Sequence, residues 1–75
     1  MAKFNGHKNW NHWNVSLWIN NDKALYLMAR DYVKINTRQN AAERMLDTLH
    51  DLGIYKTPDG APYSVSSIRA VMVGM

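Results

Sequence analysis

Three histidines are the residues of this sequence that could ligate a metal ion: His7, His12 and His50. No two of them stand four residues apart, the spacing that places two imidazoles on one face of a helix. The chain contains no cysteine, which excludes thiolate ligands, disulfide bonds and a cysteine nucleophile. We therefore expect no metal site and no cofactor.

Acid–base and nucleophilic chemistry is the second possibility that the residue types raise. His12 with Asp22 or Asp31 has the components of an acid–base pair, but no hydroxyl nucleophile stands beside them in the sequence. The serines at 64–67 have the spacing of a helix cap, and PDGAP lacks the spacing of a phosphate-binding loop. These patterns predict that the protein is not an enzyme.

All three tryptophans lie between Asn9 and Asp22, in the segment NWNHWNVSLWINND. Indole rings serve either as large core residues or as exposed anchors that stack on bases or fill a pocket of a protein partner. Spacings of three and five residues cannot turn all three rings to one side of a helix. We expect Trp13 and one other to be buried, and Trp10 or Trp18 to be exposed at a contact surface.

Basic side chains supply the other candidates for a contact surface. Arg69 is expected in the first turns of the last helix, where DNA-reading helices place side chains, and Lys56 on a turn within reach of a phosphate. The alternative is a solvated surface, because carboxylates are interspersed with the basic residues of the third helix. The predicted partner-binding residues are Trp10, Trp18, Arg38, Arg44, Lys56 and Arg69.

Five asparagines surround the tryptophans, at positions 9, 11, 14, 20 and 21. Their amides could read adenine edges. For Asn9, Asn20 and Asn21 we favour capping and turn formation. Asn14 stands inside an apolar stripe, and a buried amide needs partners. We expect Asn14 to connect its helix to the next loop.

Length and charge limit the remaining classes. A chain of 75 residues forms one domain. The net charge of +3 permits contact with nucleic acid or an acidic protein surface without requiring it, and it argues against a mimic of DNA. The N-terminus lacks an apolar signal-peptide region, and no apolar run approaches about 18 residues. We therefore expect a cytoplasmic protein with no membrane contact.

Periodicity and capping residues predict a mainly α-helical fold. The four predicted helices cover about 10–19, 22–34, 38–52 and 65–73, with N-caps at Asn9, at Asn21 or Asp22, at Thr37 and at Ser64. Gly53 is the predicted C′ residue of the third helix. Pro58 and Gly60 predict a turn, and with it a short, wing-like β-hairpin before the last helix. We expect residues 1–8 to be a flexible arm and 9–75 a single helical domain.

The apolar stripes predict which side of each helix faces the core. The first helix is apolar over much of its circumference, so we expect it to be central. Its predicted stripe is Trp10, Trp13, Asn14, Leu17 and Trp18, widened by Val15 and Ile19. The other stripes are Leu25, Met28, Ala29 and Tyr32 with Val33 and Ile35; Ala42, Met45, Leu46, Leu49 and Leu52; and Ile68, Val71 and Met72.

The tryptophan segment resembles a family of small uncharacterised proteins found mainly in bacteriophages and bacteria. The shared pattern is N-W-x-x-W-N-V-x-L-W-[IL]-x-N-D-x-x-L-Y, and it covers about a quarter of the chain. The matching residues are Asn9, Trp10, Trp13, Asn14, Val15, Leu17, Trp18, Ile19, Asn21, Asp22, Leu25 and Tyr26. The resemblance implies no particular activity. It implies a phage-type origin, where short genes often encode accessory proteins that act on host machinery.

A second segment, residues 42–72, is similar to part of the recombinase domain of large serine recombinases. There a helix ends in G-I-x-T, a P-x-G turn follows, and an S-x-x-S-[IV]-R helix begins. The matching residues are Leu49, Gly53, Ile54, Thr57, Pro58, Gly60, Tyr63, Ser64, Ser67, Ile68 and Arg69. This chain has one inserted residue, Tyr55 or Lys56, and lacks the Arg cluster that follows the serine. The likeness implies DNA contact through the turn and the last helix.

Three functions follow from these patterns. We favour a non-catalytic, phage-type accessory protein that binds a host protein and modulates or inhibits it. The alternative is a small DNA-binding protein that uses the 53–69 hairpin and last helix. The third is a minor structural or dimer-forming phage component. The patterns leave open whether the protein is a monomer or a homodimer.

Overall fold

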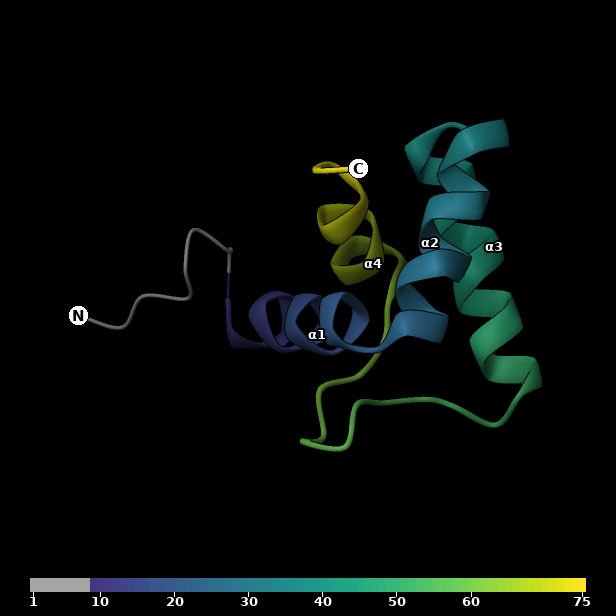
Figure 1. The fold of residues 1–75 in the computed structure, drawn as a ribbon. Coiled ribbons are helices and arrows are strands. Elements are labelled where there is room, and N and C mark those ends of the chain that lie inside the picture. Colours follow the sequence, from purple (N-terminus) through teal and green to yellow (C-terminus); the bar gives the residue numbers. More distant parts are fainter. Residues whose placement is uncertain (1–8) are drawn as a thin grey trace.

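Residues 9–75 form four helices in the computed structural model (Figure 1). Helix α1 covers Trp10–Asn21, α2 covers Lys23–Ile35, α3 covers Arg38–Asp51 and α4 covers Val65–Met72. Each bound lies within about two residues of the bound that the sequence predicts. Residues 1–8, for which a flexible arm was predicted, lie outside the described part of the chain.

Each helix begins at a side-chain cap, because the first amide groups of a helix have no partner within it. In every case an oxygen of the capping side chain accepts a hydrogen bond from the backbone N–H three residues further on. The capping residues are Asn9, Asp22, Thr37 and Ser64. Ser64 and Ser67 bond reciprocally as a capping box. The predicted caps are confirmed.

Helix α3 ends in a Schellman motif, as Gly53 predicts. Gly53 has a φ of 80°, which a glycine adopts without steric cost. Its N–H donates to the carbonyl of His50 at 3.0 Å, and the N–H of Ile54 donates to the carbonyl of Leu49 at 2.8 Å. After this end the chain continues into the connection between α3 and α4, which we call the 52–64 loop.

The predicted β-hairpin is wrong, because the 52–64 loop contains no strand and residues 9–75 form no sheet. A single isolated bridge joins Lys56 and Pro62. Two backbone hydrogen bonds flank it, from the N–H of Thr57 to the carbonyl of Ala61 at 2.8 Å and from the N–H of Tyr63 to the carbonyl of Tyr55 at 3.0 Å. Pairing goes no further, because Ile54 already belongs to the end of α3 and Ser64 caps α4. The turn itself forms: Gly60 has a φ of 97°, and its N–H donates to the carbonyl of Thr57 at 2.8 Å.

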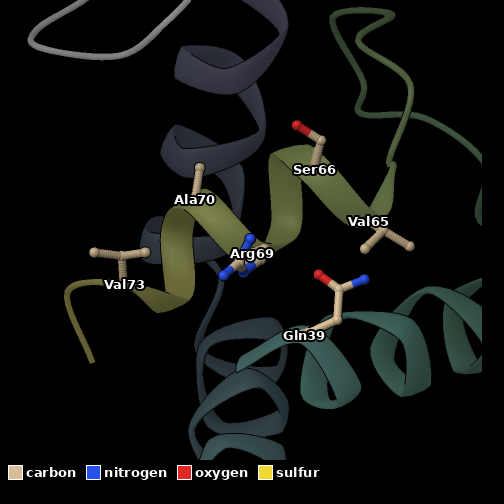
Figure 2. A pocket seen from close by; sticks show the side chains of 6 residues that line it. All are labelled: Gln39, Val65, Ser66, Arg69, Ala70 and Val73. Carbon is tan, nitrogen blue, oxygen red and sulfur yellow. The ribbon is translucent and has the colours of Figure 1, made fainter. Parts of the chain in front are cut away.

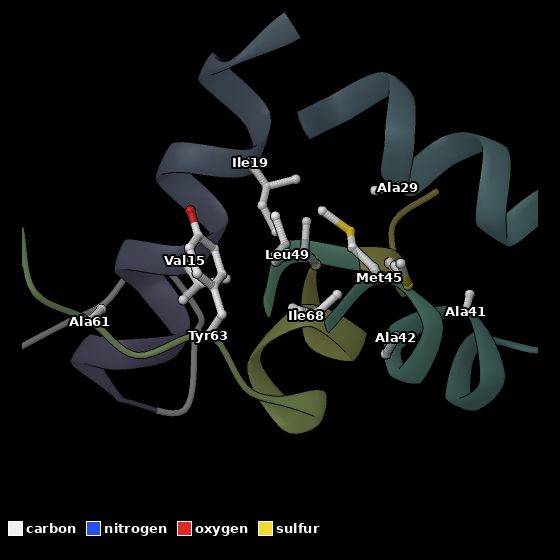
Figure 3. Packing of buried hydrophobic residues seen from close by; sticks show 12 residues of the cluster. Val15, Ile19, Ala29, Ala41, Ala42, Met45, Leu49, Ala61, Tyr63 and Ile68 are labelled. Atoms are coloured by element: carbon white, nitrogen blue, oxygen red, sulfur yellow. The ribbon is translucent and has the colours of Figure 1, made fainter. Parts of the chain in front are cut away.

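The core is built from aliphatic side chains, methionines, alanines and one tyrosine that come from all four helices and the loop (Figure 3). Helix α4 packs against α1 and α3, and α2 packs against α3 and α1. The buried members are Val15, Ile19, Ala29, Ala41, Ala42, Met45, Leu49, Ala61, Tyr63, Ile68, Val71 and Met72. Small residues such as Ala29, Ala41 and Ala42 leave room for bulky side chains of neighbouring helices to interdigitate.

No tryptophan belongs to the buried cluster, so the prediction that Trp13 and one other ring form the core is wrong. Trp13 and Trp18 are half-buried, and Trp10 is 40% exposed. The predicted inward stripe of α1 is wrong for its tryptophans and Leu17. Asn14, Val15 and Ile19 are buried as expected, together with Ser16. Periodicity failed here because polar residues are spread around α1, and two of its buried residues, Asn14 and Ser16, are themselves polar.

The other predicted stripes face the core along most of their length. Ile35 and Leu52 are exceptions, at 83% and 63% exposed. Both stand at or just beyond the last residue of their helix, where no neighbouring element covers them. None of the described helices combines the length and the hydropathy that a membrane span requires.

Candidate partner-binding surfaces

Helix α1 has three sides, and one of them faces α4. His12, Val15, Ser16 and Ile19 recur at helical spacing on this side, and Ser16 and Ile19 are buried. The Nε2 atom of His12 lies 3.0 Å from the Oγ atom of Ser66, the second residue of α4. This contact between residues far apart in the sequence holds the start of α4 against α1.

The second side of α1 faces the 52–64 loop, and Asn14 is its centre. The Asn14 Nδ2 amide donates to the Oδ2 atom of Asp59 at 2.9 Å, and the Thr57 hydroxyl donates to the Asn14 carbonyl oxygen at 2.6 Å. The Thr57 hydroxyl also accepts from the backbone N–H of Ala61 at 3.0 Å. Asn14 is 1% exposed and Thr57 3% exposed. Asn14 does connect its helix to a loop, as expected, but the expectation that this is the next loop is wrong, because the partners lie two helices further along the chain.

Trp18 joins the same network. Its indole N–H donates to the Oδ2 atom of Asp59 at 3.0 Å, one turn along α1 from Asn14. The hydrogen bond from Asn14, and after it the one from Trp18, holds the pKa of the Asp59 carboxyl below its usual value of 3.8, because both donors favour the charged form. The indole N–H of Trp18 therefore already has a hydrogen-bond partner within the fold. An anchor for another molecule would instead present this group to solvent.

The third side of α1 is the most exposed of the three. Trp10, Trp13 and Leu17 recur there at i, i+3 and i+7, and we call them the outer stripe. Trp10 is 40% and Leu17 37% exposed, and Trp13 is half-buried. Trp10 is thus the tryptophan with the largest exposed fraction. Its place among the contact residues stays a prediction.

A groove of about 470 Å³ lies between the start of α3 and the outer side of α4 (Figure 2). It is open on its solvent side. Its lining residues are Gln39, Val65, Ser66, Arg69, Ala70 and Val73. Arg69 stands near the middle of the view, between the apolar side chains of Val65 and Val73. The groove therefore combines one cation with apolar walls.

Two residues of α3 adjoin this groove and are held in place by hydrogen bonds. The Nε atom of Arg38 donates to the backbone carbonyl of Met72 at 3.0 Å, at the last residue of α4. A guanidinium suits this position because the carbonyl end of a helix attracts positive charge. The amide of Gln39 donates to the carboxylate of Glu43 at 2.8 Å. Arg38 thus has a structural role that sequence reasoning missed, since it identified Arg38 only as a contact residue.

The predicted contact residues do not gather on one surface. Arg69 lines the groove and Arg38 adjoins it, whereas Trp10 belongs to the outer stripe and Trp18 to the Asp59 network. Arg44 is exposed on the side of α3 that also carries the carboxylates of residues 43, 47 and 51. Lys56 is exposed on the 52–64 loop. No single basic face unites these cations.

Residues 9–75 contain no group of three or more His, Asp or Glu side chains that could hold a metal ion, and His7 lies outside this range. The ring of His50 stacks at a tilt on Tyr55, with centroids 5.0 Å apart. Sequence reasoning missed the hydroxyl of Ser66 beside His12, because nothing in the local pattern signals a contact across 54 positions.

Comparison with curated proteins and with solved structures gave no match. The comparison with protein families gave one family, whose match extends over residues 1–74 and thus includes every helix and both candidate surfaces. It carries no statement about recombinases, so the likeness of residues 42–72 to those enzymes stays a prediction. The chain belongs to the DUF7249 family, a family of unknown function.

Proposed function

We propose that this protein is a small non-catalytic binding module whose α3–α4 groove receives a segment of a partner protein. In the phage-type interpretation, that partner is a host protein whose activity the module modulates or inhibits. The observation that carries the proposal is the groove itself, with Arg69 between apolar walls. Such a lining suits a segment that presents a carboxylate beside an apolar side chain.

The shape of the groove favours a macromolecular segment over a free small molecule. Small-molecule sites usually enclose about 70–90% of the ligand surface. This groove is open along its solvent side, so a small ligand would leave much of its surface in water. A segment of a larger partner makes further contacts beyond the groove and does not depend on enclosure.

The charges beside the groove favour protein over nucleic acid. DNA-binding surfaces usually neutralise several phosphates, and their affinity depends steeply on salt. Arg69 is the one cation that lines the groove, and Arg38 is engaged with the end of α4. The carboxylate of Glu43 holds Gln39 at the rim and would repel a phosphate chain.

The test compares two exposed arginines that differ in position and match in chemistry. Arg69→Glu and Arg44→Glu change the net charge equally, but only Arg69 lines the groove. The tagged full chain and both variants are used to capture proteins from host lysate, and the captured protein is purified for calorimetry. We expect Arg69→Glu to weaken binding by about tenfold or more and Arg44→Glu by less than about twofold.

Two results would redirect the proposal. Equal binding by both variants would exclude the groove as the binding site. Duplex DNA binding that falls steeply with salt, and that is lost when Arg69 and Lys56 are replaced together, would support the DNA-binding alternative instead.

A hydrolytic role is the alternative that the Ser66–His12 contact raises, since Ser66 also lines the groove. A serine nucleophile also needs donors for the developing oxyanion and exclusion of water. Ser66 is exposed, which favours the binding role. Hydrolysis of an activated nitrophenyl ester by the wild-type chain, lost in Ser66→Ala, would replace the binding proposal by an enzymatic one.

A further inference from the structure

The outer stripe of α1 is an apolar surface on a helix without formal charges. Trp10, Trp13 and Leu17 form it, and the whole helix from Trp10 to Asn21 contains no Asp, Glu, Lys or Arg. Exposed amides of Asn20 and Asn21 continue the same side of the helix toward its C-terminal end. The stripe thus has an apolar centre with a neutral polar border, which is the composition of many protein interfaces.

The exposed sides of the neighbouring helices are different, because they carry formal charges. On α2 the exposed cations are Lys23, Arg30 and Lys34, which share one side of that helix at i, i+7 and i+11. On α3 the exposed side carries Arg44 among several carboxylates. A partner attracted by opposite charge would therefore find its complement on α2, α3 or the groove, and not on the outer stripe.

We propose that the outer stripe is the contact between two copies of this chain. A second copy also carries a net charge of +3, so contacts through the cations of α2 would oppose like charges. Contact through α1 opposes none. The surface is also suited to two-fold symmetry, in which one patch must complement itself. In an antiparallel pair of α1 helices, Trp10 of each copy meets Leu17 of the other, and the two Trp13 rings meet near the axis.

We expect the dimer to be weak, because the contact surface on α1 is small. Twelve residues of α-helix extend for about 18 Å. A stable interface of standard size buries about 800 Å² on each partner, more than the stripe of a single helix provides. Dimer and monomer therefore exchange, and the dimer fraction rises with protein concentration. Because α1 carries no formal charge, the dimerisation affinity should change little with salt concentration.

The proposal is independent of the groove, since the outer stripe and the groove share no residue. Each copy in the dimer keeps its own groove lining, so the assembly presents two binding sites. A partner with two copies of the recognised segment would gain avidity from this arrangement.

Analytical ultracentrifugation of the full chain over a range of concentrations tests the dimer. Leu17→Glu places a charge in the apolar contact, where it has no partner. Leu27→Glu is the matched control, because Leu27 is 44% exposed on α2 and the charge change is the same. We expect Leu17→Glu to weaken dimerisation by about tenfold or more, and Leu27→Glu to leave it within about twofold. Circular dichroism checks that both variants keep their helices.

A second measurement uses the absence of cysteine in the chain. Trp13→Cys introduces one thiol near the proposed axis, and mild oxidation should join two copies through it. Leu27→Cys, treated in the same way, should give little covalent dimer.

Three results would overturn the inference. The first is a chain that stays monomeric at the highest concentrations reached. The second is a dimer that Leu17→Glu and Leu27→Glu weaken equally. The third is equal cross-linking of the two cysteine variants. Arg69→Glu should leave dimerisation unchanged, which distinguishes failure of this proposal from failure of the groove proposal.

Discussion

The loop-facing side and the outer stripe of α1 contain the same kinds of residue and serve different purposes. Both carry indole rings, and asparagine amides stand on or beside each. On the loop-facing side, Asn14 and Trp18 donate to the carboxylate of Asp59 across more than 40 positions of the chain. On the outer stripe, Trp10 and Leu17 extend into solvent. The role of an indole on α1 therefore depends on what packs against it, and not on the residue type alone.

The difference between the two sides comes from what the rest of the chain brings to them. The 52–64 loop brings a carboxylate and a hydroxyl to one side, and both satisfy the buried amide of Asn14. On the outer stripe, Trp10 and Leu17 stay 40% and 37% exposed. The tryptophan segment therefore stabilises the fold with one side and leaves the other side available for association.

Replacement of Asn14 should give the largest effect on stability. Asn14→Leu keeps the volume but removes the hydrogen bonds of Asn14 to Asp59 and Thr57, which leaves the buried Thr57 hydroxyl without its acceptor. We expect the free energy of unfolding to fall by about 2–3 kcal/mol. Asn11→Leu, at an exposed position of the same helix, should change it by less than about 0.5 kcal/mol. Urea denaturation measures both, and equal effects would show that the network contributes nothing specific.

Trp18→Phe should give a smaller loss on the same side of α1. The ring is retained in part, but the indole N–H that donates to Asp59 is removed. Asp59 keeps its hydrogen bond from Asn14, so the loss in unfolding free energy should be about half that of Asn14→Leu or less. A loss as large as that of Asn14→Leu would mean that the ring, and not the N–H, holds the loop.

Acid should weaken the loop-facing side in a predictable direction. The pKa of Asp59 is lower in the folded chain than its usual value of 3.8, so folding favours the carboxylate. Its contribution is complete above about pH 5 and is lost as the pH falls through the lower, folded value. The stability difference between the wild type and Asp59→Asn should therefore shrink in acid. A difference that stays constant or grows toward low pH would contradict this assignment.

Trp10→Ser should give the smallest effect on stability, because Trp10 lies on the outer stripe and outside the buried cluster. We expect a change of less than about 0.5 kcal/mol in the unfolding free energy. The same variant should weaken dimerisation in the ultracentrifuge. A large loss of stability without any change in association would reverse the roles assigned to the two sides.

Local signals were enough to predict the helices of residues 9–75. The side chains of Thr37 and Ser64 accept hydrogen bonds from backbone N–H groups three residues further on, so the nearby sequence is enough to predict where each helix begins. Gly53 and Gly60 likewise adopt the positive φ that their turns require. The hairpin prediction failed because Ile54 belongs to the end of α3 and Ser64 caps α4, so the residues between them are too few for two strands. One bridge with its two flanking backbone hydrogen bonds forms instead.

The orientation of α1 and the candidate surfaces could not be predicted in the same way. Helix α1 carries both indole rings and polar side chains around its circumference, so its sequence gives no clear periodic signal for its inner side. Packing against α4 and the loop decides which side is buried. The need of Asn14 for a partner was visible in the sequence, but the identity of that partner, Asp59, depends on the fold. The carbonyl that Arg38 binds, at Met72, is equally invisible to local reasoning.

Because the three indoles of α1 have three different environments, the chain contains its own optical probes. Trp18 emits beside a carboxylate and should respond to acid, whereas Trp10 faces solvent and should respond to a collisional quencher or to an approaching molecule. Versions of the chain that retain one indole at a time would follow loop release and association as separate signals, without an external dye.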